Sequence, residues 1–86
     1  MTREEVEQRI TDIVREHLRN KETTIKPKRR FAKLGLDSLD RVEIVMDIEE
    51  KFGLTIPDAD CDGLDSIRDC TDCVARLLAA SGKLEN

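Results

Sequence analysis

Apolar side chains recur at helical spacing in three separate stretches of this 86-residue chain, and this repetition constrains its fold more than any other feature. The first stretch contains Val6, Ile10, Ile13, Val14 and Leu18. This spacing places the side chains on one face of an α-helix. Thr2 and Glu5 precede them with the spacing of a capping box. We therefore expect an amphipathic helix from Thr2 to near Asn20.

Two further helices are expected later in the chain. One runs from Ser38 to Phe52 and stops at Gly53, because glycine readily adopts the left-handed conformation that ends helices. The face expected to pack against the first helix contains Val42, Val45, Ile48 and Phe52. The last helix follows Ser66 and Asp69, which fit a second capping pattern. Its apolar face contains Ile67, Cys70, Val74, Leu77 and Leu78.

The remaining segments are predicted to connect these helices. Residues 21–37 form a long loop, residues 54–56 an extended segment closed by Pro57, and residues about 60–64 a short helical turn. The tail after Ser81 is expected to fray. The prediction is an all-α fold, a small bundle of three main helices plus the short turn. It forms a single domain over residues 1–86, ordered from about residue 2 to residue 80.

Composition limits the function of such a domain. With two phenylalanines, no tyrosine and no tryptophan, the core must be built from aliphatic residues and cysteine. A chain of this size rarely forms a deep enzyme cleft. Residues 37–86 hold thirteen Asp and Glu against five Lys and Arg. We expect a partner that presents basic residues, and no nucleic acid. The basic cluster Lys26, Lys28, Arg29 and Arg30 is interpreted as a solvated loop in preference to a phosphate-binding patch.

The three cysteines do not form a disulfide framework, since their number is odd. Cys70 and Cys73 form a C-x-x-C pair, but Cys70 lies within the apolar periodicity of the last helix. We interpret both as small buried hydrophobes in preference to a redox pair or half of a zinc site. No stretch resembles a signal peptide or a membrane span. These features predict a cytoplasmic, monomeric protein without membrane insertion.

Three further features of the sequence suggest metal binding or catalysis only weakly. Residues 58–69 place aspartates where a calcium-binding loop has ligands, but position 12 is Asp69 instead of the longer glutamate. Position 8 is Asp65, where such loops place a hydrophobe, so we predict no metal site.

His17, the single histidine, has no converging partner in sequence and is interpreted as a helix-surface residue. Ser38 has no evident activating base, which argues against a hydrolase. No catalytic residue is predicted.

Ser38 nevertheless has a conspicuous position at the start of a helix. It directly follows Asp37, and the turn glycine Gly35 lies three residues before it. A serine there is usually an N-cap, but Asp37 could share or take over the capping and leave the Ser38 hydroxyl free for modification. Placed at 100° steps, the acids of this helix share one arc, which we call the acidic stripe: Asp40, Glu43, Asp47 and Glu50. Hydrophobes border it, namely Leu39 and Met46 on one side and Ile44 on the other. Such a border suggests a docking surface.

The run LGLDSLDRVEIVMDIEEKFGLTIPD closely resembles the signature region of acyl carrier proteins, and the three-helix pattern is similar to that family along nearly the whole chain. The D-S-L triplet at Asp37, Ser38 and Leu39 resembles the family's attachment motif. The resemblance implies that a separate transferase attaches 4′-phosphopantetheine from coenzyme A to Ser38. The thiol of this arm would then carry acyl groups as thioesters, and the protein itself would be non-catalytic.

The resemblance also implies a partner surface on the same helix: Asp37, Leu39, Asp40, Glu43, Ile44, Val45, Met46, Glu49 and Glu50. Its implied partners are a phosphopantetheinyl transferase, an acyl–acyl carrier protein synthetase or acyltransferase, and ketosynthase-type enzymes with basic docking patches. They would belong to fatty-acid, lipid or polyketide-type synthesis. A peptidyl or aminoacyl carrier is the alternative within the same fold, and a calcium-binding protein is a distant one.

Two features depart from what the family leads us to expect. Arg41 stands where a small or apolar residue is expected, on the side of Val45 and Phe52. It could extend to solvent, or it could narrow or polarise a groove that shelters an acyl chain. The cluster Lys28, Arg29 and Arg30 is also more basic than expected in that loop. Together they suggest a carrier that serves a dedicated pathway.

Overall fold

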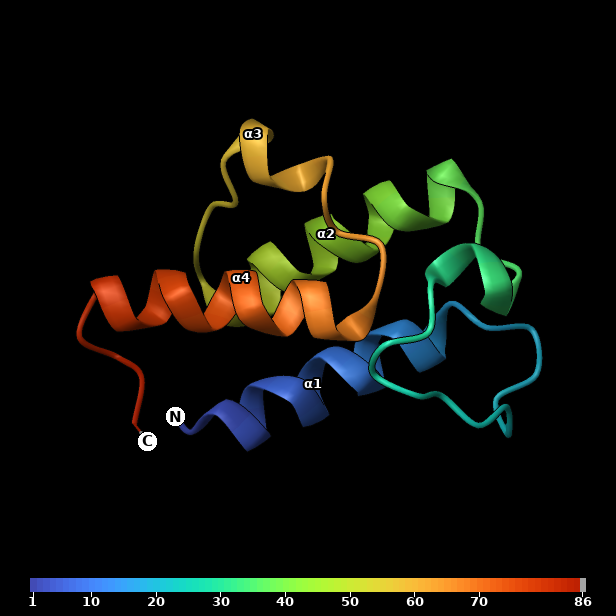
Figure 1. Ribbon diagram of the computed structural model, residues 1–86, viewed down its shortest axis with the longest axis horizontal. Coiled ribbons are helices and arrows are strands. Elements are labelled where there is room, and N and C mark those ends of the chain that lie inside the picture. Colours follow the sequence, from blue (N-terminus) through green and yellow to red (C-terminus); the bar gives the residue numbers. More distant parts are fainter. Residues whose placement is uncertain (86) are drawn as a thin grey trace.

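The computed structural model describes residues 1–85, and these residues form helices and loops without a named strand. The elements are α1 (Arg3–Glu16), the 3₁₀ helix η1 (Phe31–Leu34), α2 (Ser38–Phe52), α3 (Asp58–Cys61) and α4 (Ile67–Ala80) (Figure 1). The predicted all-α class is confirmed, with three long helices and short helical turns between them.

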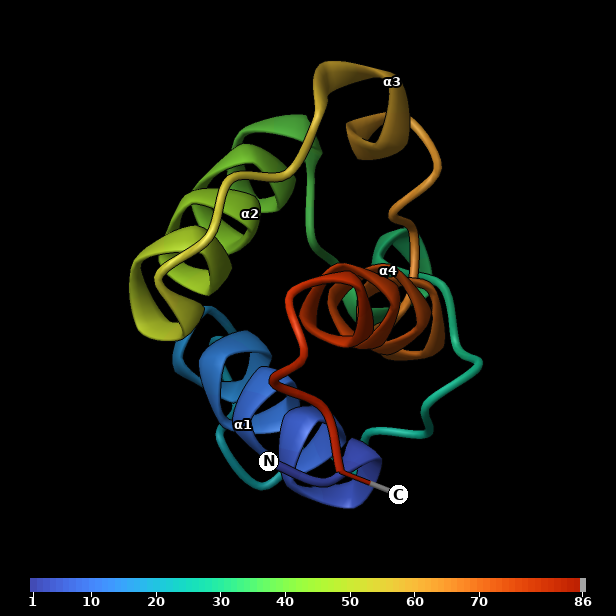
Figure 2. The ribbon, with the colours of Figure 1, turned by 90° about the vertical axis from the view of Figure 1, so that its left-hand side faces the viewer.

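The three long helices share one aliphatic core. α1 packs against both α4 and α2, and Figure 2 shows α4 lying between α1 and the short α3. The completely buried side chains include Val6, Ile10, Val14, Ile44, Ile48, Cys70 and Val74. Close packing of branched aliphatic side chains therefore supplies most of the core in a chain with only two aromatic residues, Phe31 and Phe52.

Capping side chains fix the starts of α1 and α4 as the sequence predicted. Thr2 accepts the backbone N–H of Glu5, and the Glu5 carboxylate accepts that of Thr2, which completes the capping box of α1. Ser66 accepts the backbone N–H of Asp69 at the start of α4. At the end of α2, Gly53 adopts the left-handed conformation with φ of 62°. The predicted bounds of α2 are confirmed.

The predicted end of α1 near Asn20 is wrong, since the helix ends at Glu16. His17 is its C-cap, and the chain then folds back over the helix end. The Arg15 guanidinium donates to the carbonyls of Lys21 and Thr23, at 2.6 and 3.0 Å, and holds this turn. Leu18 still reaches the core from outside the helix, which explains why its periodicity suggested a longer helix.

Three other local expectations need correction. The long loop contains η1, whose buried Phe31 anchors it to the core. The short helical turn begins at Asp58 and not near Asp60. The tail through residue 85 returns to the N-terminus, where Glu85 N–H donates to the Met1 carbonyl at 2.7 Å and Leu84 packs against the core. Both termini accordingly lie close together (Figures 1 and 2). Residue 86 of the predicted frayed tail lies outside the described residues.

The buried face of α2 also differs from the prediction. Ile44 and Ile48 are completely buried, Val45 and Phe52 are half-buried, and Val42 is 53% exposed. Hydrophobes occur almost all round this helix, so periodicity alone does not decide which of them face the core. The packing of α2 against α1 selects the side of Ile44 and turns Val42 outward.

Candidate functional site

Ser38 is the first residue of α2, is exposed, and leaves the capping of that helix to its neighbour. Asp37 is the N-cap, and its carboxylate accepts the backbone N–H of Asp40 at 2.9 Å. The Asp40 carboxylate in turn accepts the backbone N–H of Asp37 at 3.0 Å. Of the two capping arrangements left open by the sequence, the structure shows capping by Asp37, and the Ser38 hydroxyl is not needed to begin the helix.

The segment before Ser38 is held in place from both sides. Gly35 ends η1 with φ of 83°, a left-handed conformation that favours glycine. Leu36 and Phe31 are buried on either side of this turn. The Phe31 backbone N–H donates to the Asp65 carbonyl at 2.6 Å, which fastens η1 to the loop before α4. Ser38 therefore projects from a rigid base.

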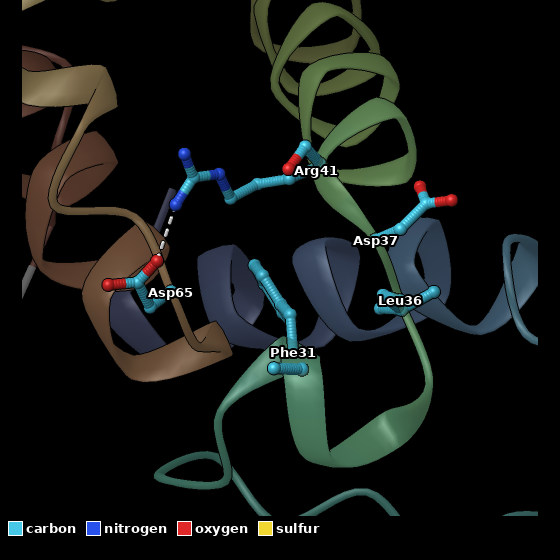
Figure 3. A pocket seen from close by; sticks show the side chains of 7 residues that line it. Phe31, Leu36, Asp37, Arg41 and Asp65 are labelled. Carbon is cyan, nitrogen blue, oxygen red and sulfur yellow. Dashed lines mark hydrogen bonds and ion pairs between the residues drawn. The ribbon is translucent and has the colours of Figure 1, made fainter.

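A small surface cavity of about 160 Å³ lies beside Ser38. It is lined by Phe31, Ala32, Leu36, Asp37, Ser38, Arg41 and Asp65. Figure 3 shows the Arg41 side chain reaching from α2 to Asp65, while Asp37 points away from this pair. Arg41 Nη1 lies 2.5 Å from Asp65 Oδ1. Arg41 thus forms a bridge between α2 and the loop before α4.

The Asp37 carboxyl group, next to Ser38, is stabilised in its ionised form. Hydrogen bonding from the backbone N–H of Asp40 lowers the pKa of the Asp37 carboxyl below its usual value. The amino end of a helix also favours negative charge, because its first backbone N–H groups point outward. Ser38 consequently offers an exposed hydroxyl at a helix start that tolerates a further anion.

The comparisons with known proteins address this same region. A family model described as "Phosphopantetheine attachment site" matches residues 8–74, a range that includes η1, α2, α3 and Ser38. The chain belongs to this family. It is also similar to "Acyl carrier protein 4, chloroplastic" from Arabidopsis thaliana, with 36% identity over 75 residues that cover 86% of this chain and 55% of the relative. This chain therefore spans about half the length of that relative.

Membership in the phosphopantetheine attachment family identifies the prosthetic group as covalently bound 4′-phosphopantetheine. Acyl carrier proteins are carriers and perform no catalysis themselves. The residues present fit such a group. Attachment through a phosphodiester needs a reachable hydroxyl that the fold does not use, and Ser38 is exposed with its capping role taken by Asp37.

The outward side of α2 in this carrier combines apolar and acidic side chains. Leu39, Val42 and Met46 are 67%, 53% and 60% exposed, and Glu43 and Glu50 are exposed near them. Val42 was missed by the sequence analysis, which assigned it to the core. Ile44 was expected to contact partners, but it is completely buried and cannot do so. Val45 is half-buried and lines a groove of about 190 Å³ with Arg41, Val42, Met46, Cys61 and Asp62.

Several acids of the acidic stripe and of the predicted partner surface already have intramolecular contacts. Asp47 Oδ2 lies 2.8 Å from His17 Nε2, and this pair joins α2 to the end of α1. The Glu49 carboxylate accepts the backbone N–H of Ile56 at 2.8 Å. Asp40 belongs to the capping box. Of the acidic stripe, Glu43 and Glu50 are the exposed members, while Asp40 and Asp47 are half-buried. His17 is thus half-buried and paired, and not simply a surface residue.

The segment that resembled a calcium loop has a different structure. Asp58 and Asp60 lie in α3, where Asp60 pairs with Arg76 at 3.3 Å, and Asp65 pairs with Arg41. Within residues 1–85, no three His, Cys, Asp or Glu side chains gather in a group that could hold a metal ion. These side chains are separated because α3 and α4 direct them to different partners.

The cysteine pair occupies the core side of α4, as predicted. Cys70 and Cys73 are buried, and Cys61 is half-buried on α3. Burial raises the pKa of the Cys70 thiol to about 12, and burial also raises the pKa values of Cys73 and Cys61. Thiols held in their neutral form are poor nucleophiles and metal ligands. They serve here as small apolar groups.

Proposed function

We propose that this chain carries acyl intermediates on a 4′-phosphopantetheine arm attached to Ser38 and delivers them to enzymes of fatty-acid, lipid or polyketide-type synthesis. One observation supports the attachment point above all. Ser38 is exposed at the first position of α2, while Asp37 and Asp40 cap the helix without it. The terminal thiol of the arm supplies the chemistry that binds the acyl group.

Attachment requires one substitution at phosphorus. The Ser38 oxygen attacks the phosphorus that joins the pantetheine half of coenzyme A to the rest of its pyrophosphate. A new P–O bond to Ser38 forms, the bond within the pyrophosphate breaks, and adenosine 3′,5′-bisphosphate leaves with that electron pair. A base of the phosphopantetheinyl transferase takes the hydroxyl proton. The rigid turn around Gly35 keeps Ser38 accessible to that enzyme.

Delivery of acyl groups to partner enzymes depends on the outward side of α2. Leu39, Val42 and Met46 form an apolar strip that partners can cover, and Glu43 and Glu50 add charge that attracts basic patches. We propose that a phosphopantetheinyl transferase, an acyl–acyl carrier protein synthetase or acyltransferase, and ketosynthase-type enzymes dock here. Asp37, Asp40, Val45 and Glu49 lie at the edges of the surface and contact partners through their exposed parts. Such contacts form rapidly and weaken with salt.

A charging experiment distinguishes an acyl carrier from the peptidyl or aminoacyl alternative. The chain, loaded with the arm and checked by intact mass, is offered to an acyl–acyl carrier protein synthetase with fatty acid and ATP. In parallel it is offered to an adenylation enzyme with its amino acid and ATP. We expect a mass increase of one fatty acyl group that neutral hydroxylamine removes. Charging only by the amino acid enzyme would support the alternative and contradict this proposal.

The cellular location is a separate prediction. A cytoplasmic location rests on three free cysteines, which suit a reducing compartment. Among residues 1–85, no helix has both the length and the apolar character needed to cross a bilayer. The chloroplast named for the Arabidopsis relative describes that protein. Fractionation of cells that express a tagged full-length chain would test the prediction.

A further inference from the structure

We propose that Arg41 binds the phosphate of the arm at Ser38, and that it does so by sharing or exchanging its ion pair with Asp65. This inference rests on the proposed attachment at Ser38. It gives a function to the arginine that stands where the family led us to expect a small or apolar residue. Arg41 acts as a positioning residue for the arm, since it holds the phosphate and takes no part in acyl chemistry.

The first support is position. Ser38 and Arg41 are three residues apart on α2, so that their side chains leave the helix as neighbours, with Cβ atoms about 5–6 Å apart. Both line the same cavity of about 160 Å³. A phosphate on the Ser38 oxygen would extend from the serine by one bond and lie within reach of a long, mobile arginine side chain.

The second support is the unused donor capacity of Arg41. Its bond to Asp65 uses Nη1, at 2.5 Å, and the side chains of Arg41 and Asp65 are 35% and 44% exposed. A guanidinium carries five N–H donors in a planar fork that suits phosphate oxygens. Arg41 can therefore retain Asp65 with one edge while another edge turns to the phosphate. A fully buried ion pair would not allow this rearrangement.

The third support is electrostatic. A phosphodiester at Ser38 places one negative charge between Asp37 and Asp40, whose carboxylates already hold the helix cap. Like charges this close raise the free energy of the loaded state. The backbone N–H groups at the start of α2 offset part of this repulsion. Arg41 is the basic residue of that first turn and supplies a full positive charge.

Binding of the phosphate by Arg41 would also change the contact between α2 and the loop before α4. Without the arm, Arg41 ties α2 to the loop before α4 through Asp65. When the phosphate also binds the guanidinium, Arg41 divides its hydrogen bonds between the phosphate and Asp65. The contact between α2 and the loop before α4 is then weaker. Modification at Ser38 would thus be transmitted to Asp65, which lies on a different segment of the chain.

The experiment compares unloaded and loaded forms of several variants, with loading checked by intact mass. Arg41→Gln removes the charge, and Arg41→Lys retains it without the fork. Arg76→Gln is the matched control, because it removes an arginine from another ion pair, that with Asp60, which does not line this cavity. The two readouts are the ³¹P resonance of the phosphodiester and the change in melting temperature on loading. Neither depends on activity.

We expect wild type and Arg76→Gln to share one ³¹P resonance and Arg41→Gln to be displaced from it. Loading should lower the melting temperature of Arg41→Gln by about 2–6 °C more than that of wild type. Arg41→Lys should lie between them, and about 1 M salt should reduce the gap. If Arg41→Gln is too unstable, Asp65→Asn gives the opposite test, since the released guanidinium should displace the ³¹P resonance the other way.

Two negative results have different meanings. Loaded Arg41→Gln that matches wild type in both readouts would overturn the role of Arg41 and leave the attachment at Ser38 intact. A wild-type chain that gains no mass with active transferase and coenzyme A would overturn the proposed function, and this inference with it.

Discussion

Asp37 and Asp40 cap each other at the start of α2, through carboxylate to backbone N–H hydrogen bonds of 2.9 and 3.0 Å, with Ser38 between them. This reciprocal pair is a structural role for two acids that the sequence suggested as partner contacts. It also separates the capping of the helix from the residue proposed for modification. The arrangement explains how a helix can begin at a serine whose oxygen is available for another bond.

The capping pair predicts a pH dependence of stability. The Asp37 pKa is lower in the folded state than its ordinary value of 3.8, because the Asp40 N–H stabilises the carboxylate. Its contribution is therefore present above about pH 3.8 and is lost as the pH falls through the lower folded pKa. Asp37→Asn should lower the melting temperature at pH 7 and weaken its dependence on pH below 4. Glu43→Gln is the control, and an equal effect there would contradict the prediction.

The two kinds of acid on α2 should respond differently to substitution. Asp47 pairs with His17, so Asp47→Ala should destabilise the fold by about 0.5–1 kcal/mol. Glu43 is exposed, and Glu43→Ala should change stability by about 0.5 kcal/mol or less. Binding to the phosphopantetheinyl transferase should weaken more for Glu43→Ala. Urea denaturation and titration calorimetry measure both quantities, and the reverse order would show that Asp47 is the docking acid.

Because of the observed orientation of α2, substitutions at Ile44 and Val42 should differ in their effect on stability. Ile44 is completely buried, and Ile44→Ala should cost about 2–5 kcal/mol of stability through lost contacts and the cavity left behind. Val42→Ala should cost about 0.5 kcal/mol or less, since Val42 lies on the surface. Val42→Ala should instead weaken partner binding. Greater destabilisation by Val42→Ala than by Ile44→Ala would favour the orientation first expected from periodicity.

Some of this structure follows directly from local sequence signals. The bounds of α2 were predictable because Gly53 ends the helix and the D-S-L triplet begins it. Its orientation was not, because apolar residues surround most of the helix and only the packing against α1 selects Ile44. The end of α1 depended on Arg15 reaching carbonyls of a later loop. The bridge between Arg41 and Asp65 likewise joins distant segments and leaves no signal in the spacing of residues.

The buried thiols predict an order of chemical modification. Alkylation requires the thiolate, and burial raises the pKa of Cys70 to about 12. Cys61 is half-buried and should react first under native conditions at pH 8, while Cys70 should react only when the fold opens. Mass spectrometry of peptides after timed iodoacetamide labelling gives the order. Cys61→Ser should remove the fast phase, and rapid labelling of Cys70 would contradict its place in the core.

The most direct test of the account is the intact mass of the chain after incubation with coenzyme A and a phosphopantetheinyl transferase of broad specificity. Wild type should gain the mass of one phosphopantetheinyl group. Ser38→Ala should gain none, while Ser81→Ala, which changes another exposed serine, should gain the full group. A gain that persists in Ser38→Ala, or no gain in wild type, would contradict the assignment of Ser38 as the attachment residue.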